Sequence, residues 1–200
     1  GDVYKRQEYK IEMEFASPNN LAFKDAYLGF NDLPFLQTLL IGNQKRPYGL
    51  DHLNSSRYNV FLERPYVIEA YNQDARRLGI CSYGISDDLR YNWRFGVFNQ
   101  QDVAKAGNYV GDAYQSELAA RFANTIWYDE ASGGRGYAHW AVSGSYADPD
   151  STDSSTARFR TRPEARSSNR WIDTKSIVGA EDYTLLGFEG DLNSFRDHIS

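Results

Sequence analysis

The chain has 200 residues, 41% of them hydrophobic and 24% charged, which is enough for one or two ordinary domains. Its 22 Lys and Arg against 27 Asp and Glu give a net charge of −5, whereas general nucleic-acid binders carry a basic surplus. A single cysteine excludes an internal disulfide framework, and the longest aliphatic run, residues 39–41, is too short for a membrane-spanning helix. Aromatic residues are abundant at 15%. The composition does not exclude a membrane β-barrel, because apolar and polar residues alternate along its strands and the apolar face is hidden in averages over the sequence.

Residues 1–7 do not read as a natural start. Gly1 stands where an initiator Met is expected, and the following run Asp2-Val3-Tyr4-Lys5-Arg6-Gln7 resembles the translation of a sequencing-library adapter. We therefore expect residues 1–7 to lie outside the fold, with a natural basic start as the alternative. On this interpretation the chain is truncated, and a missing signal peptide carries no information on its location.

Alternation of apolar and polar residues is the dominant pattern, and it predicts β-strands. In chain order, the predicted strands are residues 9–15, 23–30, 37–45, 76–83, 90–97, 115–128, 137–146 and 181–189. At about eight to twelve residues, most are longer than ordinary globular strands and close to the length that crosses a bilayer at a tilt.

Short and long connections alternate between these strands. Turn residues form short connections at 31–34, 86–88 and 132–136, and longer ones occupy 46–75, 99–113 and 147–156. This rhythm is typical of an up-and-down barrel with tight turns at one rim and larger loops at the other. A β-sandwich does not require it. Helical periodicity is confined to 46–75, where we expect one or two short helices within residues 53–71.

Large side chains share one face of the strongest strands, and charged or small polar residues occupy the other. In a soluble sandwich the apolar face would fill a core, whereas in a membrane barrel it would face lipid, with aromatic girdles near the strand ends. The aromatic residues predicted near strand ends are Tyr27, Trp127, Tyr128, Trp140 and Tyr146. Their abundance favours the girdle, and the Tyr-rich sandwich core stays open as the alternative.

Three arginines alternate in the segment 157–164. On a strand, Arg158, Arg160 and Arg162 would share one face as a column with steps of roughly 6.5–7 Å. Such a column repels itself unless anions or carboxylates lie close by, and each guanidinium presents a fork of donors that matches phosphate oxygens. The pattern predicts an anion path along a pore wall, and the alternative is a solvated edge strand protected by charge.

An ordered set of motifs resembles one known family. The motifs are Lys24-Asp25-Ala26-Tyr27-Leu28-Gly29-Phe30, Ile41-Gly42-Asn43-Gln44-Lys45-Arg46-Pro47-Tyr48-Gly49-Leu50, Phe61-Leu62-Glu63-Arg64, Arg76-Arg77-Leu78-Gly79-Ile80, Gly96-Val97-Phe98 and Arg160-Thr161-Arg162-Pro163-Glu164-Ala165. Their order, from about Tyr9 to Gly187, resembles the phosphate-selective porins O and P. The resemblance implies an outer-membrane barrel of sixteen strands, a homotrimer, inward-folded loops and a basic lumen, of which this chain would be the N-terminal half.

The resemblance also implies where anions would bind. Arg158, Arg160 and Arg162 match the family's anion ladder, and Lys45 is the first candidate for its lysine-rich constriction, with Lys24 and Arg121 as further candidates. The sequence departs from the family in having few lysines. Glu12 and Glu14 share the inward face with Lys10, so the choice between a phosphate-selective and a general porin stays open.

No catalytic or metal-binding pattern stands out. His52, His139 and His198 are isolated, and neither a nucleophile elbow nor a catalytic triad order is present. We therefore expect no enzyme activity, no cofactor and no metal.

Residues 8–190 are expected to form part of an all-β, antiparallel up-and-down transmembrane β-barrel, here a curved open sheet of about eight strands. Residues 191–200 receive no assignment. The predicted function is diffusion of small anions, phosphate or polyphosphate, through a porin of the bacterial outer membrane. Its expected partners are outer-membrane lipid, small anions and further copies in a homotrimer, and not nucleic acid. The alternative is a secreted β-sandwich carbohydrate-binding module in which Trp and Tyr stack on sugars.

Overall fold

The computed structural model describes residues 6–15, 22–55, 63–71, 76–103, 115–131, 133–149, 157–162 and 169–193. Within these ranges one large sheet dominates, accompanied by a separate two-stranded sheet and two short helices. The strands of the large sheet are β1 (Gln7–Glu14), β2 (Ala22–Leu33), β3 (Gln37–Lys45), β4 (Arg76–Ile85), β5 (Tyr91–Asn99), β6 (Ser116–Tyr128), β7 (Tyr137–Ala147) and β10 (Tyr183–Asn193).

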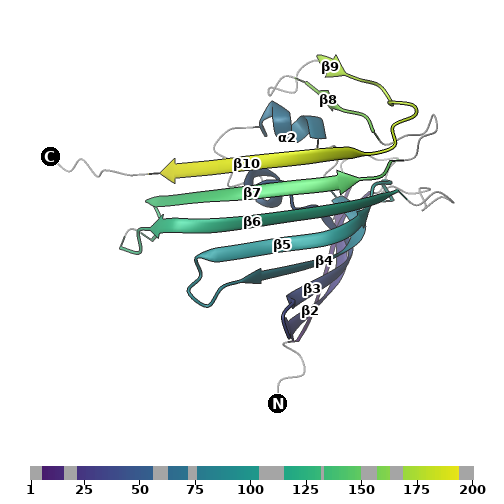
Figure 1. The fold of residues 1–200 in the computed structure, drawn as a ribbon. Coiled ribbons are helices and arrows are strands. Elements are labelled where there is room, and N and C mark those ends of the chain that lie inside the picture. Colours follow the sequence, from purple (N-terminus) through teal and green to yellow (C-terminus); the bar gives the residue numbers. More distant parts are fainter. Residues whose placement is uncertain are drawn as a thin grey trace.

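The large sheet is an open, up-and-down antiparallel sheet of eight strands in the order β1-β2-β3-β4-β5-β6-β7-β10. Every neighbouring pair is antiparallel. Figure 1 shows the sheet curving, so that β2 and β3 turn away while β6, β7 and β10 face the viewer. Among the described residues, β1 and β10 are its two unpaired edges. The predicted partial barrel with about eight strands is therefore confirmed.

The strand predictions agree with the sheet, with differences at the ends. β3 has the predicted bounds, but β2 runs to Leu33, so the expected turn at 31–34 lies mostly inside the strand. A register shift between Phe30 and Leu33 lets β2 continue, and the chain reverses only at residues 34–36. β10 reaches Asn193, so residues 191–193 of the unassigned tail belong to the large sheet. The rest of that tail lies outside the described residues.

The first residues are only partly described. Residues 1–5 lie outside the described ranges, whereas Gln7 opens β1 and the backbone N–H of Asn31 donates to the carbonyl of Arg6. The adapter origin of residues 1–7 stays a prediction.

The alternation of short and long connections is confirmed. Residues 34–36, 86–90 and 129–136 make the short turns, and 46–75, 100–115 and 148–182 make the longer connections. The turn after β6 contains Gly133 and Gly134, both with positive φ, a conformation that glycine adopts without steric cost. In Figure 1 the turns β4–β5 and β6–β7 lie at one rim.

Two short helices, α1 (Leu50–Leu53) and α2 (Tyr66–Tyr71), lie in the long connection after β3. The helix α2 confirms the short helix expected within residues 53–71, whereas α1 shares only Leu53 with that range. Neither of these helices, nor any other in the described ranges, is long and apolar enough to cross a membrane.

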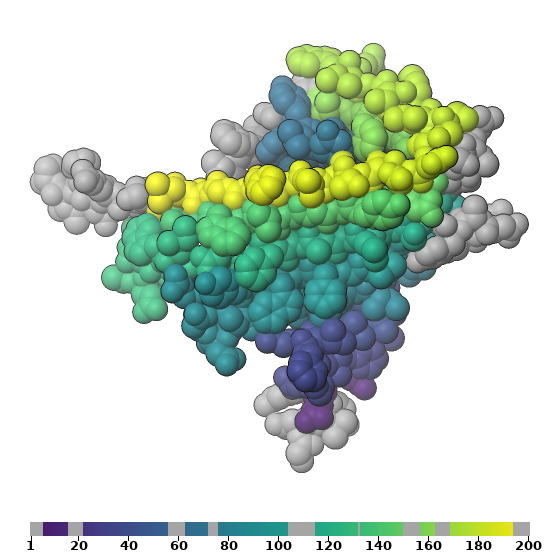
Figure 2. Space-filling view, viewed as in Figure 1, coloured from purple at the N-terminus to yellow at the C-terminus, as the bar shows by residue number. Residues whose placement is uncertain are grey.

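The two faces of the sheet have opposite character. The outer face exposes large apolar side chains, with Leu186 78% and Phe188 83% exposed on β10. The inner face buries polar ones, among them Gln44, Glu117 and Arg121. Figure 2 shows the outer face as one continuous surface from β10 to β2. The β-sandwich alternative requires a second large sheet over this face. The described ranges contain no such sheet.

Several tyrosine and tryptophan side chains of the outer face lie near strand ends, whereas Phe95, Phe122 and Phe188 are exposed in the middle of their strands. Trp127 and Tyr128 end β6 and are exposed, as is Tyr146 near the opposite end of β7. Trp140 packs within 6.0 Å of Phe122, measured between ring centroids. Tyr27 differs from its prediction: it lies inside β2 and lines a hollow on the inner face. Its position in the strand pattern, counted from Asp25, turns it inward.

Gly42 allows the close approach of β2 and β3. Its φ is +140°, and a Cβ there would overlap the carbonyl oxygen of Ala26. We expect Gly42→Ala to lower the free energy of unfolding by at least about 2 kcal/mol, because strain and overlap act together. Gly190→Ala is the matched control, since a Cβ there meets only the carbonyl of His139 at 3.9 Å. Urea unfolding of the complete protein in detergent measures both, and equal losses would contradict the expectation.

Candidate functional site

A hollow of about 530 Å³ lies on the inner face of the sheet. Strands β1 to β5 line it together with Leu53, Ser55 and Arg64 of the long connection after β3. Basic side chains outnumber acidic ones in this lining. The cations are Lys10, Lys24, Lys45, Arg64, Arg76 and Arg94, and the carboxylates are Glu12 and Asp25. We call this site the basic hollow.

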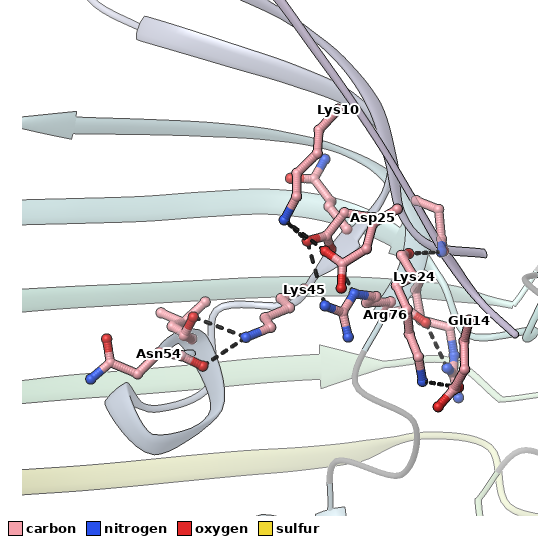
Figure 3. Close-up of polar contacts among 12 residues, drawn as sticks. Lys10, Glu14, Lys24, Asp25, Lys45, Asn54 and Arg76 are labelled. Carbon is pink, nitrogen blue, oxygen red and sulfur yellow. Dashed lines mark hydrogen bonds and ion pairs between the residues drawn. The ribbon is translucent and has the colours of Figure 1, made fainter. Parts of the chain in front are cut away.

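Asp25 is the centre of the charged cluster in the basic hollow. Its carboxylate accepts a hydrogen bond of 2.6 Å from Nε of Arg76 and another from Nζ of Lys10. Lys10 also lies 3.0 Å from Glu12. Figure 3 shows these side chains converging from β1, β2 and β4. Asp25 is only 7% exposed, so two cations offset the cost of burying its charge.

Two of the three constriction candidates come together in this hollow. Lys45, the last residue of β3, donates to the carbonyl oxygens of Leu53 at 3.1 Å and Asn54 at 2.8 Å. Lys24 lies 2.6 Å from Glu14 at the end of β1. Figure 3 shows both lysines beside the Asp25 cluster. Lys45 therefore ties the C-terminal end of α1 to the wall.

The segment that follows β3 lies against the inner face. Nη1 of Arg46 is 2.6 Å from Glu117 of β6, with side chains only 4% and 0% exposed. Tyr48 packs on the buried cluster of Cys81, Phe98 and Ala119. The N–H of Leu50 donates to Glu189 of β10 at 2.8 Å. Residues 46–50 of the connection are thus folded inward, as the resemblance implied.

Arg121, the third constriction candidate, lies apart from the two lysines. Its Nε donates to Glu189 at 2.6 Å, and its Nη1 donates to Asn92 at 3.3 Å. Since Glu189 also accepts from Leu50, Arg121 supports the start of α1 through that carboxylate. It lines no part of the basic hollow.

The arginine segment forms a shorter strand than its alternation predicted. Of the described residues 157–162, only β8 (Arg160–Thr161) is a strand, and it pairs with β9 (Ile172–Asp173) in the separate small sheet. Arg158 donates through Nε and Nη2 to both carboxylate oxygens of Asp173, at 2.8 and 2.6 Å. Arg162, which directly follows β8 in the sequence, donates to Glu69 of α2 at 3.1 Å. Carboxylates thus lie beside the arginines, as the repulsion between them required.

The pair of Asp173 and Arg158 lies outside the large sheet. The hydrogen bond from Arg158 holds the pKa of Asp173 well below its usual range. A lowered carboxylate pKa stabilises the folded state above the ordinary pKa of aspartate and loses that effect only as the pH falls through the lowered value. The pair is therefore expected to persist across neutral and mildly acidic pH.

Phe159 anchors the arginine segment to the wall. Its ring packs at 5.4 Å from Tyr71 of α2 and at 5.3 Å from Tyr183 of β10, both measured between centroids. Tyr183 in turn donates to Gln100 at 3.0 Å. The arginines therefore lie at the rim of the sheet where the long connections are found, and not along a strand of the large sheet.

The sequence pattern missed several charged residues of the inner face: Arg76, Arg94, Glu117 and Glu189. All four lie in predicted strands, and counting alternate positions from a neighbouring inward residue would have placed Arg94, Glu117 and Glu189 inside. The same count fails for Arg76, because Leu78 and Ile80, at the alternate positions of β4, are 39% and 51% exposed on the outer face. The described ranges hold no group of three or more His, Cys, Asp or Glu side chains that could bind a metal ion.

Comparison with known proteins adds two findings. The family model described as phosphate-selective porin O and P matches residues 1–194. An uncharacterized protein of Caulobacter vibrioides is 25% identical over 204 residues, which cover 99% of this chain. The chain spans 39% of the length of that relative.

Proposed function

Because the chain belongs to the phosphate-selective porin O and P family, we propose that it is part of a barrel that passes small anions across the bacterial outer membrane. The basic hollow on the inner face is the observation that carries this proposal. It supplies cations on the side of the sheet that encloses the lumen. The family implies a channel rather than an enzyme.

The outer face supports a position in lipid. Exposed apolar side chains cover it, and Trp127, Tyr128 and Tyr146 lie near strand ends, as aromatic residues do in outer-membrane barrels. The edges β1 and β10 expose backbone groups that lipid cannot satisfy. We therefore propose that further strands of a longer protein close the barrel, in line with the 39% share of the relative. We also propose a homotrimer of such barrels, as the resemblance to the family implies.

Conduction needs sites that attract anions without holding them tightly. The cations of the basic hollow meet this condition because most already have partners: Lys24 pairs with Glu14, and Lys45 donates to backbone carbonyls. An anion entering the hollow competes with these partners and therefore binds weakly. Lys45 and Lys24 are the proposed constriction residues. Arg158, Arg160 and Arg162 are proposed to attract phosphate or polyphosphate at the rim.

The proposal is tested with the complete protein in planar lipid bilayers under a salt gradient. The reversal potential should show that anions pass more readily than cations. Lys45→Gln should lower that preference, because it removes a charge from the hollow. Arg90→Gln removes the same charge from the exposed turn after β4 and should leave the preference unchanged. A cation-selective wild type would refute the function, and an unchanged preference in Arg160→Ala would refute the arginine ladder alone.

A further inference from the structure

Two arginines share one carboxylate oxygen beside the arginine segment. Nε of Arg162 and Nη1 of Arg170 both lie 3.1 Å from Oε1 of Glu69. Arg162 follows β8 and Arg170 precedes β9, so the two guanidiniums come from the two sides of one hairpin. Glu69 comes from α2, which Figure 1 shows beside that hairpin. We call this arrangement the arginine seat.

The seat has the geometry of an oxyanion site. Guanidinium forks recognise carboxylate and phosphate oxygens alike, and two of them pointing at one oxygen form a preformed clamp. The protein's own carboxylate occupies this clamp. Among these three described side chains, one negative charge against two positive ones leaves one positive charge in excess. A doubly charged oxyanion would therefore balance the seat better than Glu69 does.

Contacts other than those of Glu69 hold the two sides of the seat in place. The hairpin is fixed by the bidentate pair of Arg158 with Asp173 and by Phe159 against Tyr183. The helix α2 contacts β8, and the ring of its Tyr71 lies 5.4 Å from the ring of Phe159, measured between centroids. Neither placement rests on Glu69 alone. Its carboxylate can therefore leave the arginines without unfolding either element.

Water and ions reach the seat. The side chain of Glu69 is 13% exposed, and those of Arg162 and Arg170 are 29% exposed each. An anion at this rim can therefore meet the guanidiniums at the moment the carboxylate moves aside.

We propose that Glu69 is a built-in competitor that sets the affinity and specificity of the arginine seat for oxyanions. Phosphate or a polyphosphate terminus binds between Arg162 and Arg170 by displacing the carboxylate, and chloride, with one charge and no fork geometry, displaces it poorly. The competition keeps binding weak enough for passage. This inference rests on the proposed function, because it assumes that anions reach the seat from the lumen.

The test measures block of the chloride current by inorganic phosphate, using the complete protein in planar bilayers. Glu69→Gln should lower the half-blocking phosphate concentration roughly tenfold, because a neutral amide competes far less well for two guanidiniums. Glu69→Asp keeps the charge and should stay close to wild type. Glu130→Gln, in the exposed turn after β6, is the matched control and should change nothing.

A second measurement does not depend on conduction. Phosphate should raise the midpoint of thermal unfolding more in Glu69→Gln than in wild type, and adding Arg162→Gln should abolish that gain. If the wild type prefers anions but Glu69→Gln matches it in both measurements, the inference is overturned and the proposed function stands. If the wild type shows no preference for anions and phosphate stabilises neither protein, both are overturned.

Discussion

Arg46→Met is expected to lower the free energy of unfolding by about 3–5 kcal/mol, since it leaves a carboxylate buried without its charged partner. Glu117 is fully buried, and Nη1 of Arg46 lies 2.6 Å from its Oε2. The loss should appear in urea unfolding of the complete protein in detergent. Because Arg46 begins the inward-folded connection, the same variant should also change the single-channel conductance.

Two variants make this expectation specific. Lys24→Met breaks a pair of the same length, 2.6 Å from Glu14, but with side chains 37% and 44% exposed, and should cost no more than about 1 kcal/mol. Replacing both buried partners, as Arg46→Met with Glu117→Leu, should recover most of the stability, because no unpaired charge remains. If Arg46→Met lowered the free energy of unfolding no more than Lys24→Met does, the buried pair would contribute no more to stability than the exposed one.

The strands of the large sheet were predictable from the sequence because the alternation of apolar and polar residues along a strand is a local property. The bounds of β3 and the inward direction of Lys10 and Glu12 follow from residues two positions apart. The same counting applied from Asp25 turns Tyr27 inward, against the expectation drawn from its residue type alone. Register shifts are harder to foresee: the one between Phe30 and Leu33 moved the first short turn.

The polar contacts of the inner face could not be predicted in the same way. Arg46 and Glu117 are 71 positions apart, and Glu69 and Arg162 are 93 positions apart. Such pairs depend on how a long connection folds back over the sheet, which no local pattern encodes. The arginine segment illustrates the limit: its alternation was read as one strand, but carboxylates from α2 and β9 draw Arg162 and Arg158 to different partners.

Asp25→Asn is expected to raise the preference for anions over cations several-fold. The carboxylate pairs with Lys10 and Arg76 in the basic hollow, so removing its charge takes one negative charge away from Arg76 and from Lys10, which keeps Glu12 at 3.0 Å. Coulomb's law in water gives roughly 0.6 kcal/mol between unit charges about 7 Å apart. That energy is a factor of about 3 in the local concentration of a monovalent anion, and the factor is squared for a divalent one.

The squared factor makes phosphate the sensitive probe of Asp25. Reversal potentials in phosphate and in chloride should both shift toward anion preference in Asp25→Asn, and the shift should be larger in phosphate above the second pKa of phosphoric acid. Asp88→Asn, in the exposed turn after β4, removes an equal charge far from the hollow and should shift neither potential. High salt should shrink the difference, because it screens the charges. An equal shift in both salts would mean that Asp25 acts on the width of the passage rather than on its field.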